Sequence, residues 1–182
     1  MEYSFHFYNG MAETGILTAM GRMAQNFSSA PIVLCIGSDL AIGDSLGPIV
    51  GTMLKKKGYG GVVYGTLTTP VTAKEVKYIN NFLQRTHPNS PVIAVDAAVG
   101  DEIDIGLIKV TDVALKPGSG ANKRLGKVGD LSIMGIVAGR GSFAYSALSL
   151  TRLNMVYAMA EVISDAILSF FLGESAKGRK NA

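Results

Sequence analysis

Short apolar runs alternate with amphipathic stretches along most of the chain. The apolar runs are typical of strands buried in a sheet, and they predict strands at 31–36, 62–64, 91–95, 106–110 and 131–138. The stretches between them carry apolar residues at helical spacing, which predicts helices at 11–27, 48–57, 73–86 and 144–172. Near the N-terminus, the alternation of Tyr3, Phe5 and Phe7 with other residues weakly favours an edge strand.

Local signals support several of these boundaries. Pro48 suits the first turn of its helix, and Thr72 followed by Glu75 three residues later has the pattern of a capping box. Strands that alternate with helices imply crossover connections and a mostly parallel sheet. We therefore expect an α/β fold, a three-layer α/β/α sandwich with a mostly parallel sheet of about five strands, formed by residues 1–182 as one domain.

Composition narrows the class of protein. Hydrophobic residues make up 48% and charged residues 17% of the 182 residues, which argues against intrinsic disorder. Cys35 is the one cysteine, so an internal disulfide or a multi-cysteine metal cluster is excluded. No apolar run approaches the roughly 20 residues of a membrane span, and the first ten residues lack the basic start of a secretory signal. A reducing cytoplasm is the expected compartment, with no membrane as a partner.

The net charge of +3 is small and its basic residues are scattered. Nucleic-acid binding would want a dense basic face with stacking aromatic residues. We therefore expect no nucleic-acid partner.

Carboxylates follow two of the predicted strands. The loop after strand 31–36 contains Asp39 and Asp44, and strand 91–95 ends at Asp96. In open α/β sheets the ligand crevice lies at the carboxyl ends of the strands, where the winding reverses and the first and third strands are neighbours. Asp44 and Asp96 are thus a candidate catalytic pair, and Asp39 and Asp112 are further candidates for the same edge.

Two carboxyl groups that share a site do not ionise independently. The pKa of one is pushed upward, which provides one acid and one base near neutral pH. Such a pair can activate a water molecule and protonate a leaving group. The alternative is structural, with Asp44 placed before a helix and Asp96 capping a loop, and the residues alone leave both interpretations open.

Other kinds of site have weaker support. The glycines of the loop at 37–47 do not match G-x-G-x-x-G, and no Gly-Lys-Ser/Thr follows them. The chain has no H-E-x-x-H metal motif and no G-x-S-x-G nucleophile motif. His87 is predicted at the opposite end of strand 91–95 from the carboxylates. We expect no cofactor.

Three segments, in the same order along the chain, carry a family resemblance. The segment Ile36–Pro48 resembles the first acidic loop of the spore germination protease and of the hydrogenase maturation proteases, with Asp44 at the acidic position. Pro91–Ala97 is similar to their second acidic motif, with Asp96 at that position, and Ile108–Arg124 resembles a Pro-Gly-Ser-Gly loop of the germination protease. Chain length and the long C-terminal helix resemble the short YyaC-type sporulation proteins of endospore-forming bacteria.

The resemblance implies a phosphorylase/hydrolase-like sandwich and an aspartate-dependent peptidase of sporulation or germination. It implies that Asp44 and Asp96 are catalytic. The loops at 69–72 and 116–124 would line the groove for a protein or peptide substrate, and the resemblance points to small spore proteins. Thr72 and Lys116 therefore join Asp39 and Asp112 as candidate substrate-binding residues.

The resemblance also bears on metal and on activity. Hydrogenase maturation proteases use two acidic positions and a histidine to recognise the nickel of their substrate, and the histidine position falls near Lys116 here. A lysine argues against nickel recognition, so no metal is expected. The same departure keeps open a catalytically inactive binding or assembly protein on the same fold. A homo-oligomer is also left open.

Overall fold

The computed structural model describes residues 1–117, 127–140 and 144–180. The alternation of apolar and amphipathic stretches produces six strands, five α-helices and two short 3-10 helices within these residues. In chain order they are β1 (Glu2–His6), α1 (Ala12–Met23), β2 (Ile32–Cys35), η1 (Gly43–Ser45), α2 (Leu46–Lys56), β3 (Val63–Tyr64), α3 (Val76–Thr86), β4 (Val92–Gly100), η2 (Glu102–Asp104), β5 (Leu107–Thr111), β6 (Leu131–Gly139), α4 (Ala144–Ser149) and α5 (Leu153–Lys180).

The strands form one sheet in the order β1-β5-β6-β4-β2-β3. The four strands β6, β4, β2 and β3 run parallel to one another. β5 runs antiparallel to β6, and β1 runs antiparallel to β5. The sheet is therefore mostly parallel, as expected, with an antiparallel margin that ends in β1, the predicted edge strand.

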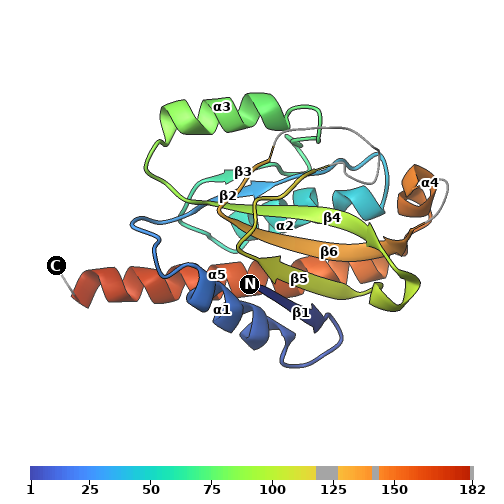
Figure 1. Cartoon of the computed structure of the whole chain (residues 1–182), viewed down its shortest axis with the longest axis horizontal. Coiled ribbons are helices and arrows are strands. Elements are labelled where there is room, and N and C mark those ends of the chain that lie inside the picture. The colour runs from blue at the N-terminus through green and yellow to red at the C-terminus, as the bar shows by residue number, and fades with distance from the viewer. Residues whose placement is uncertain (118–126, 141–143, 181–182) are drawn as a thin grey trace.

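Helices cover the two faces of this sheet unequally (Figure 1). On one face, α1, α2 and α5 bury the larger apolar core, which includes the β2 residue Val33 and the β4 residue Val95. On the other face, α3 packs through Val76 and Leu83 over a smaller core that includes Leu34. Successive residues of a strand point to opposite faces, so apolar runs such as 32–35 serve both cores. The three-layer α/β/α sandwich is confirmed.

Several predicted boundaries differ from the structure, and two of them lie near the predicted site. Strand 91–95 continues through Asp96 to Gly100, because β6 pairs with β4 beyond the point where β2 ends. The helix predicted from Ala73 begins at Val76. Glu75 still accepts a hydrogen bond from the Thr72 backbone N–H, at 2.9 Å, but this contact closes a turn before the helix.

The predicted helix at 144–172 is interrupted. It forms α4 and α5, which are separated at residues 150–152. The buried Thr151 lies in the break, and its hydroxyl donates to the carbonyl oxygen of Ala147 at 3.1 Å. This hydroxyl also lies 3.4 Å from the Val137 carbonyl oxygen of β6. A tertiary contact to the sheet thus ends the first helix.

By length and composition alone, one helix in the described part of the chain could cross a membrane. It is the Leu153–Gly173 part of α5, with a mean hydropathy of 1.7. The expectation that no such segment exists is therefore wrong by these two criteria. In the structure, one side of this helix packs in the larger core through Val156, Met159, Ala160, Ile163, Ala166, Ile167 and Phe170.

Candidate functional site

The candidate site lies where β2 ends beside β4. These strands are parallel neighbours, and Cys35 of β2 is level with Val95 of β4. Asp96 therefore stands one position beyond the last paired residue of β2. The chain leaves β2 at Ile36, whose N–H donates to the Val95 carbonyl oxygen at 2.7 Å. The adjacency of the two strands, on which the predicted pair depends, is confirmed.

The loop after β2 turns back sharply and carries Asp44 in η1. Gly37 has a φ of 141°, and a Cβ at this position would lie 2.0 Å from the backbone oxygen of Asp44. The Ser38 N–H donates to that same oxygen at 3.1 Å. At the start of α2, a Cβ on Gly47 would lie 2.1 Å from the Ile36 oxygen. Both glycines are needed because backbone approaches backbone, which holds Asp44 over the end of β2.

Asp96 is a buried carboxyl group, and few hydrogen bonds offset the cost of burying its charge. Its side chain is 8% exposed, and its Oδ1 accepts a hydrogen bond from the Ala97 N–H at 2.9 Å. Burial raises the pKa of Asp96 well above its usual value, the negative charge of Asp44 raises this pKa further, and the Ala97 N–H opposes both. As the pH rises, Asp96 is therefore the member of the pair that loses its proton last.

Asp44 is half-buried. Burial raises its pKa, while the Ser38 backbone N–H acts in the opposite direction by favouring the charged form. The charge of Asp44 acts on Asp96, so the structure brings these two predicted residues into one electrostatic environment. The pair can hold one ionised and one protonated carboxyl group near neutral pH.

Two other candidates lie in loops near this edge. Asp39 is exposed in the same loop as Asp44. Thr72 follows Val71, which bridges Ile36 on the side of β2 away from β4. Two strand spacings therefore separate Thr72 from Asp96, which is about 10 Å between backbones. The Thr72 hydroxyl donates to the carboxylate of Glu75.

Asp112 lies at the opposite edge of the sheet, so the expectation that places it near the pair is wrong. β5 runs antiparallel, and its last residue, Thr111, is level with Ser132 at the start of β6. Asp112 accepts a hydrogen bond from the amino group of Met1 at 2.5 Å. This contact lowers the pKa of the exposed Asp112 carboxyl group. The direction of β5, which the apolar pattern does not report, decides its position.

Lys116 is exposed. Neither a hydrogen bond nor an ion pair joins it to Asp44 or Asp96 in the part of the chain that the structure describes. The rest of its predicted groove loop, residues 118–124, lies outside the described residues. The role of Lys116 in substrate binding stays a prediction.

Metal-binding side chains do not gather at this edge. No group of three or more His, Cys, Asp or Glu side chains suited to a metal ion occurs among residues 1–117, 127–140 and 144–180. His87 lies beyond α3, near the start of β4 and away from the pair, and its Nε2 is 3.1 Å from the Tyr64 hydroxyl. Cys35 is fully buried, and burial raises its thiol pKa far above the usual value, which is typical of an unreactive cysteine.

Sequence reasoning missed some of the residues that shape the site. Leu148 and Thr151 lie against Gly43, because a Cβ there would be 2.9 Å from each of their side chains. The segment that joins α4 to α5 therefore supports η1 and, through it, Asp44. Two surface hollows, of about 350 and 300 Å³, lie away from the pair, one between β1 and α1 and the other beside α3.

Comparison with known proteins places the chain in a family. Residues 4–166 match the model of a family described as "Protein of unknown function (DUF1256)". The chain belongs to this family. It is also 43% identical over 154 residues to the "Uncharacterized protein YyaC" of Bacillus subtilis (strain 168), an alignment that covers 84% of this chain and 75% of that protein. The expected kinship with YyaC-type proteins is confirmed.

A solved structure shows the same fold. The crystal structure of the [NiFe] hydrogenase maturation protease HycI from Thermococcus kodakarensis KOD1 superposes with a TM-score of 0.52 at 17% sequence identity. The match covers 86% of this chain and 98% of that one. It supports the α/β/α sandwich as a fold shared by this DUF1256 member and a maturation protease.

Proposed function

We propose that this DUF1256 protein is an aspartate-dependent peptidase that uses Asp44 and Asp96. The observation that carries the proposal is the unequal burial of two interacting carboxyl groups at the carboxyl edge of a parallel sheet. Open α/β sheets place their ligands at this edge. The resemblance to the germination protease and the fold shared with a maturation protease agree with this class of reaction.

The burial of each carboxyl group suggests its role. Asp44 is the more exposed of the two and ionises first, so it is the base that takes a proton from the attacking water. Asp96 keeps its proton and donates it to the scissile carbonyl oxygen, where negative charge develops. The single protein hydrogen bond of Asp96 goes to Oδ1 within the described residues, which leaves Oδ2 for the substrate.

Proton transfers to and from the two carboxyl groups complete the hydrolysis. Water adds to the carbonyl carbon, its proton passes to Asp44, and the carbonyl oxygen is neutralised by Asp96. Collapse of the tetrahedral intermediate breaks the C–N bond when Asp44 delivers its proton to the leaving amine, and Asp96 recovers its own. The pair returns to its starting protonation state without any co-reactant other than water.

The proposed substrates are small spore proteins, and the proposed setting is the cytoplasm of a sporulating cell or spore. Both follow from the resemblance to the germination protease. The loop residues Asp39, Thr72 and Lys116 would contact the substrate chain, and no metal would take part.

A second candidate is a catalytically inactive binding or assembly protein. The lysine at position 116, where the related proteases have a histidine, favours it. It retains the fold without the chemistry, so it predicts that Asp44 and Asp96 can be replaced without loss of function.

The test is incubation of the purified protein with an acid extract of small spore proteins, followed by mass spectrometry of the products. We expect Asp44→Asn and Asp96→Asn each to lower the cleavage rate by about 100-fold or more, since each removes a general acid or base. Asp130→Asn is the matched control, because Asp130 is exposed at the opposite edge and its carboxylate accepts a hydrogen bond from the Val92 N–H at 2.8 Å. An asparagine oxygen can keep that bond.

Two results would count against the peptidase. If both variants cleave at the wild-type rate, the pair is not catalytic. If the folded wild-type protein cleaves nothing in the extract but retains one of its components on a column, the inactive binding protein is the better description.

A further inference from the structure

The outer edge of β1 is an exposed strand with a regular hydrogen-bonding face. β1 lies at the end of the strand order, and its one strand partner within the described residues is β5. The Phe7 N–H donates to the Gly106 carbonyl oxygen at 3.0 Å and so points toward β5. Because this direction alternates along a strand, the backbone groups of Glu2, Ser4 and His6 point away from the sheet.

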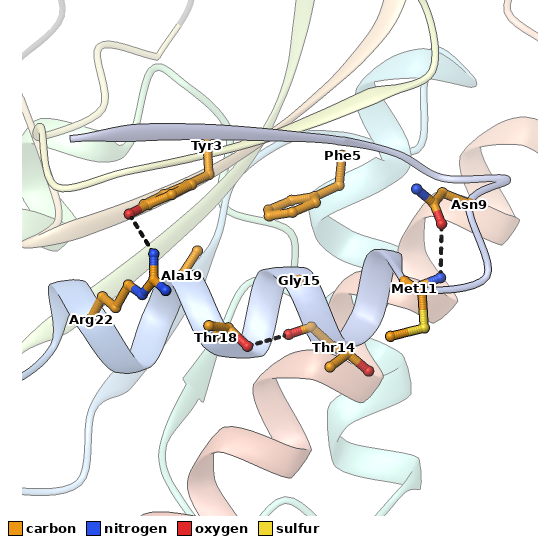
Figure 2. Close-up of a pocket in the computed structure, with 9 residues that line it drawn as sticks. All are labelled: Tyr3, Phe5, Asn9, Met11, Thr14, Gly15, Thr18, Ala19 and Arg22. Atoms are coloured by element: carbon orange, nitrogen blue, oxygen red, sulfur yellow. Dashed lines mark hydrogen bonds between the residues drawn. The ribbon is translucent and has the colours of Figure 1, made fainter.

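The side chains of β1 also divide into two sets. Glu2, Ser4 and His6 are exposed on one face, whereas Tyr3 and Phe5 are half-buried on the other. Tyr3 and Phe5 point toward α1 and form one wall of the hollow of about 350 Å³ (Figure 2). The Arg22 guanidinium donates to the Tyr3 hydroxyl at 3.2 Å across this hollow.

We propose that a second copy of this chain binds here, through antiparallel pairing of the two β1 strands about a two-fold axis at Ser4. This register pairs Ser4 with itself, so each copy donates one N–H to the other. It places Glu2 opposite His6 of the second copy, a carboxylate facing an imidazole that can donate a hydrogen bond to it. It also places Tyr3 opposite Phe5 of the second copy, an aromatic cross-strand pair.

The helix beneath β1 fits the same arrangement. α1 packs against both β1 and β5, so it lies beneath the edge of the sheet that would form the interface. In the paired copies the two α1 helices would lie on the same face of the joined sheet. The α1 side of the hollow is lined by the short residues Thr14, Gly15, Thr18 and Ala19 and by Arg22.

Pairing with a second copy explains both the arrangement of the β1 side chains and the hollow beneath β1. The acidic and imidazole side chains stand at symmetric distances from Ser4, so the edge is complementary to itself. The hollow lies directly beneath the strand that would pair, so the second copy's α1 would cover it. This inference is independent of the proposed peptidase activity, which resides at a different edge of the sheet.

Sedimentation velocity over a range of concentrations tests the proposal. We expect the wild-type protein to reach twice the mass of the chain, and Ser4→Pro to weaken association by about tenfold or more. Proline at this position removes an outward N–H and leaves the bonds to β5 intact, as edge strands tolerate. Ser4→Ala is the matched control, because it keeps the backbone donor and should associate as the wild type does.

A charge exchange keeps the test decisive if the proline variant folds poorly. Glu2→Lys alone and His6→Glu alone should weaken association, and the double variant should restore it, because lysine and glutamate then face each other. A wild-type protein that stays at the mass of one chain at every soluble concentration overturns the proposal. So does a dimer that all of these folded variants, Ser4→Pro included, leave unchanged.

Discussion

Asp96 is the residue at which burial and charge oppose each other most strongly. It is 8% exposed within a sheet strand, and an ionised carboxylate there is poorly solvated. The nearby Asp44 adds repulsion, and only the Ala97 N–H favours the charged form. A side chain that costs stability in the ionised state and contacts few polar groups is a common feature of functional sites.

Replacement of Asp96 should therefore change how stability depends on pH. A raised pKa means that the folded protein binds more protons than the unfolded chain, so the free energy of unfolding falls as pH rises above about 4. The fall is about 1.4 kcal/mol per pH unit until the raised folded pKa is reached. Asp96→Asn lacks this contribution, so we expect its stability relative to the wild type to improve from pH 4 to pH 8.

Urea unfolding of both proteins across this range measures the difference. The exposed Asp101, which makes no side-chain hydrogen bond in the described structure, provides the control variant Asp101→Asn. A constant difference between Asp96→Asn and the wild type at all pH values would show that Asp96 is ionised in the folded protein throughout.

The β2–α2 connection is the element that positions the candidate site. Gly37 and Gly47 let the loop pass within contact distance of the end of β2, and the α4–α5 junction supports η1 through Gly43. Since Asp44 lies between these contacts, its side chain is held by packing of the backbone. The loop that carries Asp44 is thus part of the rigid scaffold of the candidate site.

We predict that Gly37→Ala destabilises the protein by about 2 kcal/mol or more, because the new Cβ would meet the Asp44 backbone oxygen and the φ of 141° is unfavourable for alanine. Gly21→Ala in α1 is the matched control. It meets nothing within 4 Å, and it should raise stability by about 0.5–1 kcal/mol. Thermal unfolding of the two variants measures both effects, and an unchanged stability of Gly37→Ala would contradict the tight loop.

Across the whole molecule, the sheet holds the candidate catalytic and metal-binding side chains at separate places. The Asp44–Asp96 pair lies at the carboxyl edge of the parallel strands, whereas Asp112 lies at the opposite edge because β5 is antiparallel. His87 and Cys35 are held elsewhere, one at the hydroxyl of Tyr64 and the other inside β2. The nitrogen and sulfur ligands that first-row transition metals favour are thus kept apart from the carboxyl pair.

We therefore predict that the proposed peptidase activity does not depend on a transition metal. Treatment with a chelator should leave the cleavage rate unchanged, and elemental analysis of the purified protein should find nickel and zinc far below one equivalent per chain. The prediction would be wrong if near-stoichiometric metal were lost together with the activity and restored with it.

The parallel core of this protein can be predicted from the pattern of apolar residues. Apolar runs indicate burial on both faces of a strand, so β2, β4 and β6 were predictable, and the order of strands and helices placed Asp44 and Asp96 near the carboxyl ends of neighbouring strands. The direction of β5, the extension of β4 past Asp96 and the break before α5 at Thr151 depend on the tertiary structure. These depend on which strand pairs with which and on contacts such as that of Thr151 with β6, and periodicity along the chain records neither. The different burial of Asp44 and Asp96, on which the proposed roles of base and acid depend, arises in the same way from packing of distant segments.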